Sequence, residues 1–199
     1  MKRYFGYKCT DKEGFTLAEV LITIGVIGVV AAMTIPTLMM NYQRKVWEAR
    51  LKKSFSIAVN ACERMLVEEN VSASNETELF REVNNANVRK YFKVLRDGEL
   101  TTHGFLIALP DGADLYFNAN NDLPGFNFYV DVNGDSSKPN TAGRDLFEFD
   151  LDRNCTYSSA NATSDEAKRF KYVAEHNWEI PDDPADYAAA EEAEESPAP

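Results

Sequence analysis

The segment Gly14-Phe15-Thr16-Leu17-Ala18-Glu19 opens an apolar run that continues to Ile35 and is followed by Pro36. The 19 residues from Leu17 to Ile35 contain one ionisable group, the carboxyl of Glu19. Because a helix rises about 1.5 Å per residue, a run of this length nearly spans a hydrocarbon core roughly 30 Å thick. A carboxylate costs about 2.5–3.5 kcal/mol at the centre of a bilayer and less near the interface. The run therefore predicts a membrane helix in which Glu19 needs a compensating partner.

The helical pattern continues beyond Pro36 with a different character. Apolar side chains recur at spacings of three and four, which is typical of one buried helix face. The members of this stripe are Trp47, Leu51, Phe55, Ala58, Cys62 and Met65. We therefore predict one long helix over residues 16–68. Proline has no N–H for its own helical bond, so we expect a kink or local melting at Pro36.

A set of residues at the N-terminus, in this order and register, resembles the start of type IV pilins and of the pseudopilins of type II secretion systems. The set is Gly14, Phe15, Thr16, Leu17, Glu19, Gly28 and Pro36. The resemblance implies that a prepilin peptidase removes a basic leader, residues 1–14, by cutting between Gly14 and Phe15 on the cytoplasmic side. It also implies N-methylation of Phe15 and pairing of Glu19 with the N-terminus of a neighbouring subunit.

Two other interpretations of the apolar run stay open. An ordinary secretory signal has a small-residue cleavage site after its apolar core, and residues 30–32, Val-Ala-Ala, would suit one. A plain single-span anchor would carry Glu19 as an incidental polar residue. The N-terminus of the mature protein distinguishes these interpretations from the pilin-like one.

Composition restricts the kind of partner that the chain has. The 199 residues carry a net charge of −11, and loss of residues 1–14 leaves 185 residues at −13. This balance is too acidic for a nucleic-acid binder, and no basic stripe with interleaved aromatics occurs. The four basic residues of the leader favour a cytoplasmic N-terminus. With the resemblance, they predict a single-pass protein of the bacterial inner membrane whose head lies outside the cytoplasm, alone or in a periplasmic or extracellular filament.

Short strand patterns follow a second helical region. We expect a helix capped at Asn75, interrupted near residues 84–87 and ending near Leu95. Strands are predicted over residues 105–109, 114–117, 126–132 and 146–151, with a turn at Pro110-Asp111-Gly112 and a loop over residues 118–125. Residues from Ser164 onward again suggest a helix. The fold class is therefore α+β, with a small antiparallel sheet that buries the helix stripe. The pilin resemblance implies the same layout.

The chain divides into four predicted parts: leader 1–14, membrane or filament-core helix 15–40, head 41–180 and tail 181–199. The tail has seven acidic and no basic residues, so we expect disorder there. Cys62 and Cys155 remain after loss of the leader, and in an extracytoplasmic head they form either a disulfide or two buried thiols.

One loop has the composition of a hard-cation site. Asp131, Asn133 and Asp135 alternate, and Asp145 follows, which suits either Ca²⁺ or a turn held by Asx hydrogen bonds. A glutamate at the twelfth position of a calcium loop is missing, because Ala142 stands there. Otherwise no cofactor is expected.

The sequence favours assembly over catalysis. His103 and His176 are the only histidines, and neither lies in a triad or metal motif, so no catalytic residue is predicted. We expect a structural subunit of a type IV pilus or a type II secretion pseudopilus, whose partners are the prepilin peptidase, copies of itself and other pilin-like subunits. A membrane-tethered enzyme or binding protein is the alternative hypothesis.

Overall fold

The computed structural model describes residues 14–120, 125–134, 140–160, 162–183 and 185–187, without the side chains of residues 119 and 120. The chain divides into two compact units, residues 1–43 and 44–199. Helix α1 (Leu17–Glu69) contributes residues to both units, and each unit is described by itself.

In the first unit, α1 presents its apolar side chains outward. None of the residues from Gly14 to Gln43 is buried. The hydroxyl of Thr23 donates to the carbonyl of Glu19 (2.8 Å), and that of Thr34 donates to the carbonyl of Val30 (3.0 Å). These bonds within the helix satisfy polar groups that a hydrocarbon environment would leave without partners.

The helix is continuous through Pro36. Its residues from Leu17 to Glu69 are all helical, so the helix does not melt at the proline; a kink there, the other predicted outcome, stays a prediction. The missing N–H removes one bond of the helical ladder, and the bonds on either side keep the helix in register. The predicted boundaries, 16 and 68, are each one residue from the observed ones.

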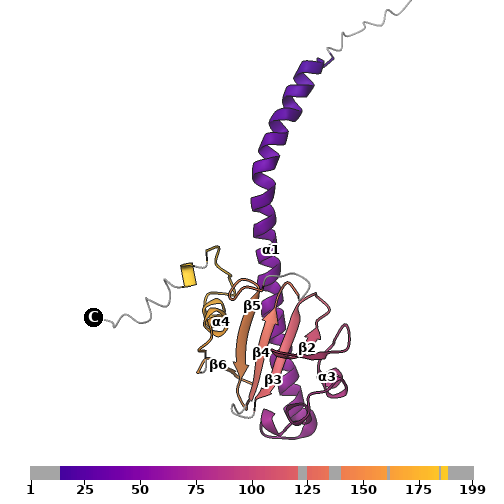
Figure 1. The fold of residues 1–199 in the computed structure, drawn as a ribbon, viewed down its shortest axis with the longest axis vertical. Helices are drawn as coiled ribbons and strands as arrows, with labels where there is room; N and C mark the ends of the chain where they lie inside the picture. Colours follow the sequence, from indigo (N-terminus) through magenta and orange to yellow (C-terminus); the bar gives the residue numbers. More distant parts are fainter. Residues whose placement is uncertain (1–13, 121–124, 135–139, 161, 184, 188–199) are drawn as a thin grey trace, which may run out of the picture. The chain divides into compact units, whose positions relative to one another are not determined.

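The second unit contains a six-stranded antiparallel sheet in the order β1-β2-β3-β4-β5-β6 (Figure 1). The strands are β1 (Glu99–Thr101), β2 (Gly104–Ala108), β3 (Asp114–Asn120), β4 (Gly125–Asp131), β5 (Leu146–Leu151) and β6 (Tyr157–Ser158). Each strand pairs with the next one in the chain, so the sheet is a meander. A long N-terminal helix followed by this sheet is an α+β fold with a pilin-like layout, as predicted.

The core of the second unit lies between α1 and one face of the sheet. Leu51, Ala58, Cys62 and Met65 are buried, and the partly buried Trp47 and Phe55 pack against this cluster, so the predicted helix stripe is confirmed. From the sheet side come ten apolar side chains of alternating strand positions: Phe105, Ile107, Leu115, Phe117, Phe126, Phe128, Val130, Phe147, Phe149 and Leu151. The Phe55 ring lies 5.2 Å from that of Phe149, centroid to centroid, in an edge-to-face arrangement.

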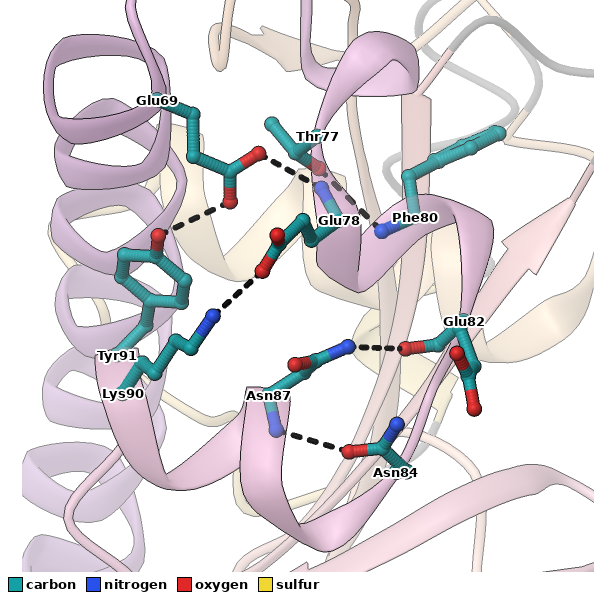
Figure 2. A network of polar contacts seen from close by, with 9 residues as sticks. All are labelled: Glu69, Thr77, Glu78, Phe80, Glu82, Asn84, Asn87, Lys90 and Tyr91. Carbon is teal, nitrogen blue, oxygen red and sulfur yellow. Dashed lines mark hydrogen bonds and ion pairs between the residues drawn. The ribbon is translucent and has the colours of Figure 1, made fainter.

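The end of α1 is tied to three short helical segments, η1 (Ser74–Glu76), α2 (Glu78–Arg81) and α3 (Asn85–Tyr91). Figure 2 shows the polar contacts that hold α2 and α3. The carboxylate of Glu69 accepts bonds from the Tyr91 hydroxyl (2.9 Å) and the Glu78 backbone N–H (2.7 Å), and Lys90 forms an ion pair with Glu78. One glutamate on the last turn of α1 therefore positions both α2 and α3.

The predicted second helix is interrupted, as expected, but the break lies at residues 82–84 and the helix ends at Tyr91, not near Leu95. The predicted cap is wrong: it is not Asn75 but Thr77, whose hydroxyl accepts from the Phe80 N–H (3.3 Å). Asn84 caps α3 by accepting from the Asn87 N–H (2.9 Å). Asn75 instead lies inside η1.

The sheet has two strands that were not predicted, β1 and β6, which have three and two residues. The four predicted strands are present with ends shifted by up to three residues. Residues 118–120 extend β3, although we expected a loop there.

Helix α4 (Asp165–Glu175) and the segment after it complete the head. A helix was predicted from Ser164 onward; Ser164 is instead the cap of α4, which begins at Asp165, and its hydroxyl accepts from the Ala167 N–H (3.0 Å). Beyond α4 the chain does not become an independent tail at residue 181. Asp182 forms an ion pair with Arg44, and the buried Tyr187 donates its hydroxyl to the Gly143 carbonyl (2.6 Å). The head therefore extends at least to Tyr187, and the remaining predicted tail, residues 188–199, lies outside the described residues.

Candidate functional site

The peptide bond between Gly14 and Phe15 lies just before α1. Residues 14–16 are not helical, and Phe15 is 89% exposed. A Cβ on Gly14 would have no atom within 4 Å, so the chain itself does not crowd this position. The bond is therefore presented in a non-helical, open segment, which is the form in which a peptidase binds its substrate.

Glu19 has a partner within its own chain. Its Oε2 accepts from the backbone N–H and from the hydroxyl of Thr16, both at 2.9 Å. The Thr16 hydroxyl in turn accepts from the Glu19 N–H (3.3 Å). This reciprocal arrangement is a capping box, in which residues three apart satisfy each other at the start of a helix. The carboxylate is also favoured by the positive end of the helix dipole.

The helix that begins at this cap is long and apolar enough to cross a membrane. It is the one helix in the described part of the chain that meets this condition, and none of its most apolar 18-residue window is buried within the protein. Its apolar side chains therefore have to be covered by lipid or by other protein chains.

Residues 9–35 match the family model for the prokaryotic N-terminal methylation motif. The chain carries the prepilin-type cleavage and methylation signature of type IV pilins and pseudopilins. The motif includes the Gly14–Phe15 bond, the capping box and the apolar helix up to Ile35. No curated protein and no solved structure shows significant similarity to the chain.

The prepilin-type motif and the apolar helix fit a membrane-anchored, single-pass protein. Within the motif, the structure brings Thr16 and Glu19 together and leaves Gly14 and Phe15 exposed. Thr16 was missed as the partner of Glu19, although the Thr-x-x-Glu spacing of a capping box was visible in the sequence.

The turn after β4 gathers three of the four residues predicted for a cation, and Asp135 lies outside the described residues. Asp131 Oδ1 accepts from the N–H groups of Asn133 (3.1 Å) and Gly134 (3.0 Å). The Asn133 amide donates to Asp145 Oδ2 (2.8 Å), whose other oxygen accepts from the Thr141 N–H. Asx hydrogen bonds therefore hold this turn.

Two buried oxygens of this turn, Asp131 Oδ2 and Asn133 Oδ1, accept no hydrogen bond from any described residue. Burial raises the pKa of Asp131 to about 6, and the charges of Asp145 and Asp114 add to the rise, against the two backbone hydrogen bonds. Two free oxygens are fewer than the six to eight that Ca²⁺ takes. Among the described residues no three His, Cys, Asp or Glu side chains are arranged to hold a metal ion.

Cys62 and Cys155 form a disulfide with a Cα–Cα distance of 5.6 Å. It joins the buried face of α1 to the turn between β5 and β6. The bridge connects residues 93 apart in sequence, and closing a loop of that size stabilises a fold by about 4–5 kcal/mol through the lost entropy of the unfolded chain.

Both histidines belong to the second unit, outside the residues of the prepilin-type motif. His103 packs beside the rings of Tyr116 and Tyr129, with centroids 6.1 and 5.7 Å away. His176 is the C-cap of α4, where its Nδ1 contacts the Tyr172 carbonyl (2.8 Å). The described residues around them form no nucleophile–base pair.

Proposed function

We propose that the chain is a structural subunit of a filament of the type IV pilus or type II secretion pseudopilus kind. The observation that carries the proposal is the prepilin-type motif at the start of a helix whose most apolar window is not buried by any described residue. A prepilin peptidase cuts between Gly14 and Phe15 and Phe15 is N-methylated. The helices of processed subunits then pack together in the filament core.

In this proposal Glu19 changes partner on assembly. In the single chain its carboxylate is bound by Thr16, so it is satisfied before assembly. Cleavage creates a cationic amine at Phe15, and a neighbouring subunit offers that amine to Glu19. A charge-assisted bond to an amine is stronger than one to a hydroxyl, so the exchange favours the assembled state and selects its register.

The experiment compares filaments sheared from cells that make the full chain together with a prepilin peptidase. Glu19→Val is expected to be inserted and processed normally and to yield no filaments. Gly14→Arg is the matched control that stays unprocessed. If Glu19→Val assembles as well as the parent, the assembly role of Glu19 is wrong. A parent chain that is processed but never assembles overturns the filament function.

The orientation that we propose is a cytoplasmic leader and an extracytoplasmic head. Four basic residues of the leader support it, and the disulfide is of a kind that persists in oxidising compartments. An alkaline phosphatase domain fused after Pro199 is expected to be active. An inactive fusion, with an active fusion at the N-terminus, contradicts this orientation.

We keep Ca²⁺ binding at the turn after β4 as a separate proposal, supported by the two oxygens without donors. Asp131, Asn133 and Asp145 would hold the ion, together with Asp135, which lies outside the described residues. Ca²⁺ is then expected to raise the unfolding temperature of the full chain, and Asp131→Ala is expected to remove that rise. Equal unfolding temperatures of the parent in Ca²⁺ and in EDTA contradict Ca²⁺ binding and leave the Asx bonds as the sole support of the turn.

A further inference from the structure

Two half-buried carboxylates, Glu148 and Asp150, lie on β5 beside β4, and the half-buried Glu166 lies in the first turn of α4. Glu148 and Asp150 point to the same sheet face, and the amide nitrogen of Asn127 donates to both, at 2.7 and 2.8 Å. The hydroxyl of Ser164 donates to the other oxygen of Glu148. Neither carboxylate forms an ion pair in the described part of the chain, so all its described partners are neutral.

The carboxylates make the electrostatic potential around Tyr129 and Asp150 negative. Burial raises the pKa of Tyr129, and the charges of Glu148, Glu166 and Asp150 raise it further. Burial likewise raises the pKa of Asp150, and the Glu148 charge adds to this rise, against the Asn127 hydrogen bond. The main causes of both shifts include no basic side chain of the described residues, although α4 itself carries Lys168, Arg169 and Lys171. We name Glu148, Asp150 and Glu166 the acidic edge.

The segment that follows α3 has the opposite charge. Residues 89–98 carry four basic and one acidic residue in a chain of net charge −11. Lys93 and Arg96 are exposed and form no ion pair with the described residues, and Leu95 between them is 70% exposed. The Leu95 N–H donates to the Ala108 carbonyl (2.9 Å), which fixes this segment beside β2. We name Lys93, Leu95 and Arg96 the basic edge.

The two edges lie at opposite ends of the strand order. The basic edge adjoins β1 and β2, and the acidic edge adjoins β4 and β5; in Figure 1, α3 lies on the β2 side and α4 on the β5 side of the sheet. A contact between two different patches of identical chains is heterologous. When such a contact does not close into a ring, it propagates as a helical filament.

We propose that heads of neighbouring copies pack through these patches, the acidic edge of one against the basic edge of the next. The inference rests on the proposed function and names the partner surface of the head. The occupant is a second copy because the chain itself supplies the complementary charge, and a filament brings copies side by side. Such complementarity sets the register and partner of a contact more than its affinity. Glu99, an exposed acid that directly follows this segment, lowers the attraction.

The test uses charge reversal in the full chain. Arg96→Glu and Glu166→Lys each place like charges opposite one another, and each is expected to lower the yield of sheared filaments about threefold to tenfold. The double variant restores the pairing with the charges exchanged and is expected to recover the parent yield. Arg153→Glu makes the same charge change in the β5–β6 turn and serves as the matched control. Unchanged unfolding temperatures show that all heads are folded.

Cysteine cross-linking identifies the partner. Cells that make Arg96→Cys and Glu166→Cys chains together are expected to yield a disulfide-linked dimer, and cells that make either chain alone are not. The inference is overturned if parent filaments form while the reversals leave the yield unchanged and no dimer appears, and the proposed function then still stands. Loss in the single variants without recovery in the double variant, with cross-links to another protein, assigns the edges to a different partner and also overturns it. A parent that forms no filaments overturns both.

Discussion

The two halves of α1 differ in whether their apolar side chains are buried within the chain. From Leu17 to Met40 the helix is apolar all round and none of it is buried, whereas from Arg44 to Glu69 one face is buried against the sheet and the other is polar. The apolar face of the second half therefore packs against the sheet of the same chain. The apolar side chains of the first half need lipid or other chains to cover them. The comparison indicates that head stability depends on the second half of α1, whereas the proposed assembly depends on the first half.

The largest expected change in head stability comes from removing the disulfide, which is bonded to the second half of α1. Replacing Cys62 and Cys155 together by Ser is expected to lower the free energy of unfolding of the head by about 4–5 kcal/mol, because the unfolded chain regains the entropy of the closed loop. Urea unfolding of the full chain in detergent measures this. Processing at the N-terminus is expected to be unchanged. A loss below about 1 kcal/mol contradicts the stabilising role.

A matched pair of leucines compares the halves directly. Leu51 is fully buried in the head, and Leu38 is 70% exposed. Leu51→Ala is expected to cost about 2–5 kcal/mol of head stability, since it leaves a cavity, and Leu38→Ala less than about 0.5 kcal/mol. Thermal or urea unfolding followed by tryptophan fluorescence gives both values. Equal losses would show that the first half is also covered within the chain.

The polar network at the end of α1 gives a pH dependence. Burial raises the pKa of Tyr91 to about 12, and its bond to Glu69 adds to the rise. Because the folded pKa lies above the unfolded value of about 10, the stabilising effect is complete below pH 10 and is lost as the pH rises towards 12. Tyr91→Phe is expected to be less sensitive to pH over this interval. The same alkaline loss in both proteins would assign it to another group.

The smallest expected effect lies at the start of the first half. Thr16→Val removes the hydroxyl of the capping box and is expected to destabilise the first helical turn by about 1 kcal/mol, with head stability unchanged. Hydrogen exchange of the first-turn amides measures the fraying. Exchange as slow as in the parent would mean that the capping box does not hold this turn.

Long periodic patterns were predictable and short elements were not. The ends of α1 and the strands β2 to β5 follow from runs of five or more residues with clear periodicity. In contrast, β1 and β6 have too few residues to show alternation, and the exposed Leu100 in β1 gives no sign of a core. The cap at Thr77 was missed because Asn75, two residues earlier, is an equally good cap by residue type.

The candidate site was predictable where it depends on local sequence. Gly14, Phe15 and Glu19 followed from the resemblance, and the motif that includes them is present. The contacts of Asp182 and Tyr187 with the head were not predictable, because the acidic, Ala- and Pro-rich composition of this segment indicates disorder. The structure nevertheless buries Tyr187 and pairs Asp182 with Arg44. Such long-range contacts leave no periodic signal.

The mass of the N-terminus of the mature protein tests the central claim most directly. The full chain is produced together with a prepilin peptidase, purified from the membrane and measured intact and after digestion. The account predicts loss of residues 1–14 and an N-terminal Phe15 that carries one methyl group. A chain that still begins at Met1, or one that begins just after Ala32, contradicts it and favours a plain anchor or a secretory signal.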